Sequence, residues 1–301
     1  MNNEVKKIDN SFSSVNKEEI ATVSGKDISF LENIVRSKEK YYIEKQLIRN
    51  AKTQIIHPSI LGLKSTQRLI VDYLSENIKF PPCAHGSIKH KSTKTNAKIH
   101  RGKKYVLAMD IKNFFPSITK NMVLNNFLAH GMNIDTAKLA TELFTYKGTL
   151  QIGPPSSPFV ANLVLMPLDL LVQRFCKKHK LKYTRYMDDI SISGNKTLHP
   201  YFGTIKKYIN QYGFELAYQK TQFMERDRPQ VVTKIVVNEK IGPIKKYISD
   251  FRKEIRERWT GSQREDIDAF KKRAWGKIAY IKQYNKRVAR ELRGLLVKIP
   301  K

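Results

Sequence analysis

The sequence predicts an α+β fold, in which a few strands, two of them in a tight hairpin, lie among helices. The apolar run YVLAMDI at 105–111 is typical of a buried strand, and 182–192 contains two strand-like stretches around a short turn. Apolar residues recur at helical spacing in 119–130, 135–146 and 159–174. With 301 residues, of which 41% are hydrophobic, the chain can form one large domain or two to three subdomains around a common core.

The remaining segments are predicted mainly from their apolar spacing. Residues 28–50 and 63–78 have helical spacing, and 246–297 is a basic, mostly helical tail. Residues 1–27 are polar and are predicted to form a flexible extension, while 84–104 is basic, poor in large apolar groups and predicted to be a loop. Cys83 and Cys176 form neither a disulfide framework nor a zinc motif.

The charge of the chain indicates its partner. The formal net charge is +29, with 56 Lys and Arg against 27 Asp and Glu. An excess of this size favours a polyanion, either nucleic acid or an anionic membrane surface. The chain has no run of 18 apolar residues, no apolar signal-peptide core and no lipidation motif. We therefore expect a cytoplasmic protein that binds nucleic acid and no membrane.

Three acids in apolar surroundings are the candidate catalytic groups. Asp110 lies at the end of the strand 105–111, and Asp188 and Asp189 lie at the tip of the hairpin. Two carboxylates about 4 Å apart repel by roughly 4 kcal/mol at an effective dielectric constant near 20, and a divalent cation removes that repulsion. Oxygen ligands of this kind suit Mg²⁺ shared with substrate phosphates. Each acid alone is also a common strand-end or turn residue. Spacing by itself therefore favours metal-dependent nucleotidyl transfer only modestly over a purely structural role for these acids.

Four segments resemble the motifs of reverse transcriptases. Residues 186–189, Tyr-Met-Asp-Asp, are similar to the YxDD box. In the order found in that family, 110–118 (Asp-Ile-Lys-Asn-Phe-Phe-Pro-Ser-Ile) resembles motif A, the Gly/Pro/Ser turn 153–158 resembles motif B, and 213–221 resembles motif D. The resemblance covers residues 40–240. It implies a right-hand polymerase with fingers, a palm made of an antiparallel sheet plus helices, and a helical thumb.

Two further segments are similar to the retron type of these enzymes. Asn96-Ala97-Lys98-Ile99-His100 matches the NAxxH signature, and 232–234 stands where retron enzymes carry Val-Thr-Gly. Here lysine replaces the glycine, which leaves the details of RNA recognition open. The nucleic-acid contacts implied by the resemblance are Asn96, His100, Tyr186, Val232, Thr233 and Lys234.

The resemblance also assigns the metal site. Asp110 and Asp188 are expected to bind two Mg²⁺ ions directly, with Mn²⁺ as an alternative ion. Asp189 is expected to be a supporting acid of the same catalytic group, and Ile111 is expected to add its carbonyl oxygen to the metal shell.

Five residues are implied to bind the nucleotide. Phe115 fits the aromatic residue that excludes a ribose 2′-hydroxyl, and Lys220 fits a group that neutralises or protonates pyrophosphate. Lys91 stands where the family often has an arginine on the triphosphate. The motif B turn departs from the family, because an isoleucine occupies the usual glutamine position and Gln151 lies one residue earlier; Gly153 is expected to be the retained element. For Phe115 and Lys220 the alternatives are a core aromatic and a surface lysine.

The resemblance divides the chain into an extension at 1–27, fingers at 28–104, a palm at 105–240 and a thumb at 241–301. The last segment has 18 Lys and Arg against seven Asp and Glu, as expected for helices that hold a duplex by its phosphates.

The function implied is RNA-directed DNA polymerisation. The enzyme would copy its cognate non-coding RNA from dNTPs, begin at a 2′-hydroxyl, retain the branched RNA–DNA product and act with a defence effector protein against phage. Two alternatives stay open at this point: a bacterial reverse transcriptase outside retrons, of the abortive-infection or group II intron type, and a non-catalytic RNA-binding scaffold with the same fold.

Overall fold

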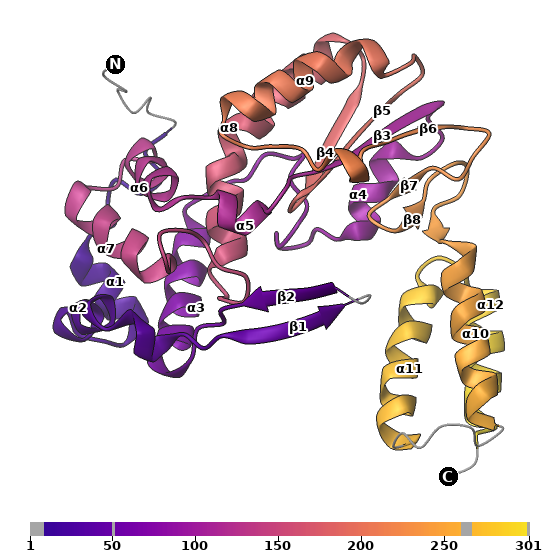
Figure 1. The fold of residues 1–301 in the computed structure, drawn as a ribbon, viewed down its shortest axis with the longest axis horizontal. Helices are drawn as coiled ribbons and strands as arrows, with labels where there is room; N and C mark the ends of the chain where they lie inside the picture. The colour runs from indigo at the N-terminus through magenta and orange to yellow at the C-terminus, as the bar shows by residue number, and fades with distance from the viewer. Residues whose placement is uncertain (1–8, 50–51, 260–266, 300–301) are drawn as a thin grey trace.

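The protein has three structural parts, shown in the computed structural model of Figure 1, which describes residues 9–49, 52–259 and 267–299. The first is a helical cluster at the N-terminal side, and the second is a four-stranded sheet with its helices. The third is a group of C-terminal helices that stands apart from the helical cluster in Figure 1. The candidate site residues lie mainly in the second part.

The N-terminal cluster packs around apolar side chains from several short helices. The hairpin of β1 and β2 extends away from it (Figure 1). The elements are α1 (Lys17–Ser24), α2 (Ile28–Arg36), the 3₁₀ turn η1 (Lys38–Tyr41), β1 (Lys45–Arg49), β2 (Lys52–Ile56), α3 (Leu61–Glu76), α6 (Lys120–Ala129) and α7 (Ile134–Phe144).

Two predictions for the N-terminal region are wrong. Residues 9–27 are docked, because Phe12 is fully buried and contacts Phe127, while Asp9 accepts a 2.8 Å hydrogen bond from His130; residues 1–8 lie outside the described chain. The helix predicted at 28–50 ends at Arg36. The chain then forms η1 and β1, and β1 pairs with β2 in an antiparallel hairpin.

The central sheet is antiparallel with the strand order β4-β5-β3-β6. Its strands are β3 (Tyr105–Asp110), β4 (Lys182–Tyr186), β5 (Asp189–Gly194) and β6 (Gln222–Glu225). Strands β4 and β5 form the predicted hairpin, and β3 pairs with both β5 and β6. The helices around this sheet are α4 (Thr93–His100), α5 (Phe114–Ser117), α8 (Ser157–Lys178) and α9 (His199–Gln211).

The two faces of the sheet are packed differently. Arg185 of β4 bonds to α8 and Thr184 bonds to α4, so the alternation of side chains along a strand assigns the faces. The α8 face is apolar and belongs to the main core, in which Ile190 and Ile192 are buried. The α4 face carries small and polar residues, and a smaller core forms there against β7 (Val231–Val232) and β8 (Ile235–Val236).

Helix α8 runs behind the sheet and is the longest helix described. It is long and apolar enough to cross a membrane by length and composition alone. In the fold, however, 67% of its most apolar stretch is buried inside the protein, against the sheet and α9. The apolar composition of α8 is therefore explained by its position in the core.

The C-terminal helices have a core of their own. After β9 (Gly242–Pro243), α10 (Lys245–Trp259), α11 (Ile267–Lys282) and α12 (Lys286–Val297) pack around buried residues such as Phe251, Phe270 and Leu292. The basic residues of these helices occupy the remaining, largely exposed positions. The helical tail predicted at 246–297 is confirmed where the structure describes it.

The prediction of a loop at 84–104 is wrong for its second half, where α4 forms. Ser92 caps this helix and completes a capping box with Thr95. The face of α4 that packs on the sheet consists of Asn96, Ala97 and His100, two of which are polar. A search for apolar periodicity misses such a helix because its buried face is largely polar and packs through hydrogen bonds.

Candidate active site

The three predicted aspartates meet at one end of the central sheet. Asp110 is the last residue of β3 and Asp189 the first of β5, and strand pairing places them directly opposite each other. Asp188 lies in the hairpin turn after Met187, whose φ of 57° makes the turn tight. A 3.0 Å bond from the Ile111 amide to the Asp188 carbonyl ties the turn to the end of β3. Asp110 and Asp189 therefore project from the same face.

The electrostatics of this group favour a cation. Burial, followed by the charges of Asp188 and Asp110, raises the pKa of Asp189 to about 7. Burial and then Asp110 also raise the pKa of Asp188. Carboxylates crowded in this way are stabilised in their ionised form by a divalent cation. The donors here are all oxygen, which suits Mg²⁺.

The protein does not enclose a metal by itself. Across residues 9–49, 52–259 and 267–299, no three His, Cys, Asp or Glu side chains form a ready-made metal cluster. Mg²⁺ commonly takes one or two protein carboxylates and completes its shell with water and substrate phosphates. The donor set fits such a shared site, for which the backbone of Ile111 lies adjacent.

Lys220 is brought to the aspartates by the fold. It ends the short 3₁₀ turn η2 (Tyr218–Lys220), and its Nζ donates a 2.7 Å hydrogen bond to Oδ1 of Asp110. The Ala217 amide donates to the Asp110 carbonyl at 2.8 Å, which holds η2 beside the end of β3. The Lys220 side chain is 62% exposed, so its ammonium group can move away when another cation or a phosphate enters.

The predicted nucleotide contacts Phe115 and Lys91 and the predicted nucleic-acid contact Tyr186 come from three different segments. Phe115 is in α5, half-buried beside Phe114, at a ring distance of 5.1 Å. Tyr186 pairs with Asp189 at the end of β4 and therefore projects from the same face as the aspartates. Lys91 donates to the Pro82 carbonyl at 2.6 Å, and no contact between it and the aspartates is formed in the described chain.

The motif B turn is fastened to the β1–β2 hairpin. A Cβ on Gly153 would lie 2.8 Å from Cα of Pro58, and the φ of Gly153 is 120°, so only glycine fits. The His57 amide donates to the Ile152 carbonyl at 2.9 Å. Gln151 is buried, and its amide donates to the Tyr146 carbonyl at 2.7 Å, inside its own turn. Gln151 thus stabilises the turn, and its role as a nucleotide contact stays a prediction.

Asn96 and His100 were predicted to contact nucleic acid, and the structure corrects both assignments. Both are fully buried. The ring nitrogens of His100 bond at 2.7 Å to Thr184 of β4 and Ser193 of β5, and burial lowers its pKa to about 3. These residues fasten α4 to the sheet, so any effect on nucleic acid is indirect.

The two retron-like segments lie together although more than 130 residues separate them. Nδ2 of Asn96 is 3.4 Å from Oγ1 of Thr233, and α4 packs on β7 and β8. Thr233 and Lys234 have φ values of 47° and 65° and form the two-residue turn of the β7–β8 hairpin. Lys234 is exposed at the tip, whereas Val232 is fully buried and contacts no nucleic acid through its side chain.

The conformation of this turn explains the usual glycine. A positive φ costs an L-amino acid with a side chain about 1 kcal/mol more than it costs glycine. The lysine here keeps the same turn and adds a positive charge to it.

Sequence reasoning missed a buried polar network behind the hairpin turn that carries Asp188. The Arg185 guanidinium bonds to Asp169 of α8 at 2.7 and 2.9 Å, to Oδ1 of Asn162 at 3.0 Å and to the Met187 carbonyl at 3.0 Å. Asn162 in turn donates to the Gly86 carbonyl at 2.8 Å. The available signal was a single acid, Asp169, in the apolar run that forms α8.

The network controls the position of the turn. Burial alone lowers the pKa of Arg185, but the Asp169 carboxylate raises it above its usual value, so the guanidinium is charged. It donates to the backbone of Met187, the residue that precedes Asp188. Gly86 packs against the same turn, since a Cβ there would lie 2.5 Å from the Met187 amide nitrogen.

Comparison with known proteins places this geometry in a family. Residues 44–260 match the family model described as reverse transcriptase (RNA-dependent DNA polymerase). The chain is 28% identical to the retron Mx65 reverse transcriptase of Myxococcus xanthus, over 92% of this chain and 70% of that protein. It is 30% identical to the retron Ec86 reverse transcriptase of Escherichia coli, over 75% of this chain and 71% of that one.

A solved structure of Candida albicans telomerase with a fragment of telomeric RNA aligns with 90% of this chain and 66% of its own, at 10% identity and a TM-score of 0.48. The family model spans more than two thirds of the sequence, including all three aspartates. The chain therefore belongs to the reverse transcriptase family, as a bacterial retron-type RNA-directed DNA polymerase with the right-hand α+β fold.

Proposed function

We propose that the protein copies a structured non-coding RNA into DNA by two-metal nucleotidyl transfer. The observation that carries the proposal is the placement of Asp110 opposite Asp189, with Asp188 in the adjoining turn and Lys220 bonded to Asp110. Bound Mg²⁺ would supply charge neutralisation for the attacking hydroxyl and the leaving pyrophosphate. Asp110, Asp188 and Asp189 hold the ions, with the Ile111 carbonyl beside them.

The proposal assigns the remaining parts as follows. Residues 28–104 form the fingers, 105–240 the palm and 241–301 the thumb. The exposed basic residues of α10–α12 contact the phosphates of the RNA–DNA product, and Lys234 lies on the palm side of the thumb. Lys220 neutralises charge on the pyrophosphate when it leaves Asp110, and Lys91 is the weaker candidate for a triphosphate contact because Pro82 holds it.

The retron relatives extend the proposal to the product and its role. We infer that synthesis begins at a 2′-hydroxyl of the template RNA and yields branched RNA–DNA that stays bound. We further propose that this complex acts with a defence effector protein against phage, in the bacterial cytoplasm. The support is the similarity to several retron enzymes and the retron-like segments at α4 and the β7–β8 turn.

The experiment that tests synthesis compares the nucleic acid bound to purified wild-type protein and to Asp188→Asn. The wild type is expected to carry DNA joined to RNA, released by a 2′,5′-debranching enzyme, and the variant to carry RNA alone. Loss of a metal ligand removes several kcal/mol of stabilisation, or at least about 10³-fold in rate. DNA on Asp188→Asn equal to that on the wild type, or none on either, would refute the proposal. Phage challenge of cells carrying each form tests the defence role.

Phe115 is proposed to exclude ribonucleotides by its ring. Phe115→Ala is expected to raise the incorporation of ribonucleotides relative to deoxyribonucleotides by roughly tenfold or more, because the space for a 2′-hydroxyl opens. Phe115→Tyr keeps the ring and is the matched control. Single-nucleotide extension with each substrate measures the ratio, and an unchanged ratio in Phe115→Ala would assign the ring to the core alone.

A further inference from the structure

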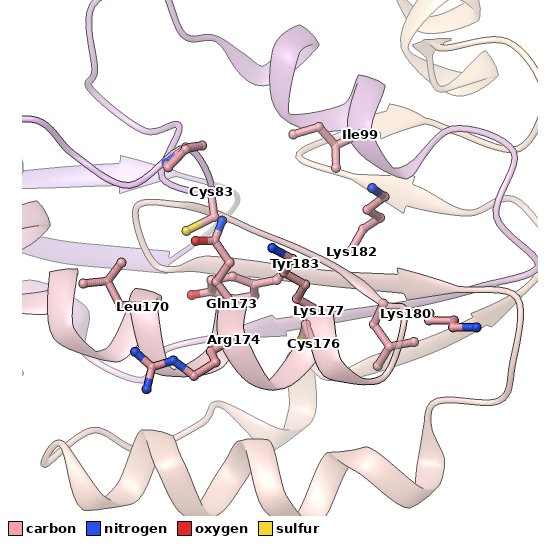
Figure 2. A pocket seen from close by; sticks show the side chains of 12 residues that line it. Cys83, Ile99, Leu170, Gln173, Arg174, Cys176, Lys177, Lys180, Lys182 and Tyr183 are labelled. Atoms are coloured by element: carbon pink, nitrogen blue, oxygen red, sulfur yellow. The ribbon is translucent and has the colours of Figure 1, made fainter.

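A groove with a volume of about 840 Å³ follows the outer edge of β4, away from the aspartates (Figure 2). Strand β4 is an edge strand of the sheet, so this side is not covered by another strand of that sheet. The groove, here called the β4 groove, is lined by Pro82, Cys83, Ile99, Leu170, Gln173, Arg174, Cys176, Lys177, Lys180, Leu181, Lys182 and Tyr183.

Four of the lining side chains are cationic and none is acidic. Arg174 and Lys177 lie one turn apart on α8, Lys180 follows the end of the helix, and Lys182 begins β4. All four are exposed, and none makes an ion pair with any residue that the structure describes. Figure 2 shows the charged ends of Arg174, Lys180 and Lys182 extending away from the apolar floor.

The dipole of α8 explains only part of the positive charge along the groove. A lysine in the last turn of a helix is stabilised by the helix dipole, typically by 0.3–1 kcal/mol. This applies to Lys177, but Lys180 and Lys182 lie beyond the last turn of α8. Mutually repelling cations without counter-ions are stabilised when an anion binds among them. The anion has to be extended, because the four groups follow the length of the groove.

The floor of the groove is apolar and continues along α8. Leu170 is 40% exposed. Leu170 and Arg174 also line a second cavity of about 760 Å³, which runs on past Pro167 and Leu171 to Tyr212. A cationic rim above an apolar floor accommodates a polymer with phosphates on one side and sugars and bases on the other.

Strand pairing argues against a peptide added to the edge of the sheet. The amide and carbonyl of Arg185 already bond to Cys83 and His85, at 2.8 and 2.7 Å. Along an edge strand, the backbone amide and carbonyl of every second residue point toward the open edge of the sheet. Between Lys182 and Arg185, the only other residue of β4 in such a position is Tyr183. One residue is too short an edge for strand addition.

We propose that the β4 groove binds the phosphate backbone of the enzyme's structured RNA, outside the cleft that holds primer and template. This inference rests on the proposed function, since it requires an RNA that stays bound. Lys182 and Tyr186 are the two ends of β4, about 13 Å apart at 3.3 Å per residue. The groove therefore holds RNA beside the catalytic centre and leaves the aspartates free.

The groove also gives α4 a function. Ile99 of this helix forms one wall of the groove. The buried neighbours Asn96 and His100 fasten α4 to the β7–β8 turn and to the sheet. The NAxxH-like segment therefore shapes the RNA-binding surface from behind.

The test removes three charges and keeps a polar side chain at each position. The variant is Lys177→Gln/Lys180→Gln/Lys182→Gln, and its rescue form carries arginine at the same positions. The control is Lys64→Gln/Lys79→Gln/Lys138→Gln, three exposed lysines of the N-terminal cluster without an ion pair in the described chain. Thermal unfolding confirms that all forms fold.

Two probes separate the groove from the catalytic cleft. The first is the RNA extracted from purified wild-type protein, with binding measured between 50 and 200 mM salt. The groove variant is expected to bind it about 10- to 100-fold more weakly, with a log–log salt slope smaller by about 2 to 3. The second is oligo(dT) on poly(rA), whose extension is expected to stay within about twofold of the wild type.

The outcomes distinguish the two proposals. RNA affinity and salt slope equal to those of the control variant would overturn the assignment of the groove. So would unchanged RNA binding together with loss of a co-purifying acidic protein, because the groove would then hold a protein. Failure of the wild type to extend oligo(dT) would refute polymerase function and leave the binding result to be judged separately.

Discussion

Replacing Arg185 with methionine is expected to destabilise the protein by about 3–5 kcal/mol and to lower the turnover number for DNA synthesis by about 100-fold. The substitution leaves the Asp169 carboxylate buried without its partner. It also removes the donor to the Met187 carbonyl, which lies next to the catalytic Asp188. Thermal unfolding measures the first effect, and primer extension with saturating nucleotide measures the second.

A double variant separates stability from positioning. Arg185→Met/Asp169→Leu removes both charges and is expected to recover much of the stability. Its turnover number is expected to stay low with a nearly unchanged KM, because no side chain then holds the turn. Full turnover in the double variant would show that strand pairing alone positions Asp188. Arg68→Met, at an exposed arginine of α3, is the control and is expected to change neither quantity.

The second large effect is the pH dependence caused by His100. Burial lowers the pKa of His100 to about 3, well below its value near 6.5 in an unfolded chain. Between these values the unfolded chain binds a proton that the folded protein does not, so stability is lost as the pH falls below about 6.5. The expected loss is about 1.4 kcal/mol per pH unit over most of this range.

The measurement compares the wild type with His100→Gln by urea unfolding from pH 7 to pH 4.5. Asp189 has a raised pKa and contributes with the opposite sign over part of this range, and His85 contributes with the same sign as His100. The difference between the two proteins isolates His100, because both keep Asp189 and His85. The stability advantage of the wild type is expected to shrink steadily with acid. A difference independent of pH would show that folding leaves the pKa of His100 unchanged.

Local patterns were sufficient for much of the fold and for placing the three aspartates near one another. The strand 105–110, the hairpin and the long helices follow from apolar periodicity, and the aspartates lie where strands end. Periodicity fails where the buried face is polar, as in α4, or where a polar segment has few but well-placed apolar residues, as at Phe12. The assignments for Asn96, His100 and Val232 were wrong because a motif identifies the residues but not whether they are exposed.

The sequence alone determined that the chain is a basic α+β protein with three aspartates at strand ends, since composition and short-range periodicity are local properties. The tertiary structure decided which charges act together. It placed Lys220 on Asp110, paired Arg185 with Asp169 behind the catalytic turn and gathered four cations along the edge of β4. These groups come from separate elements of the chain. The buried charges are paired because an unpaired polar group in the interior is costly. The exposed cations have no such requirement, because solvent screens them.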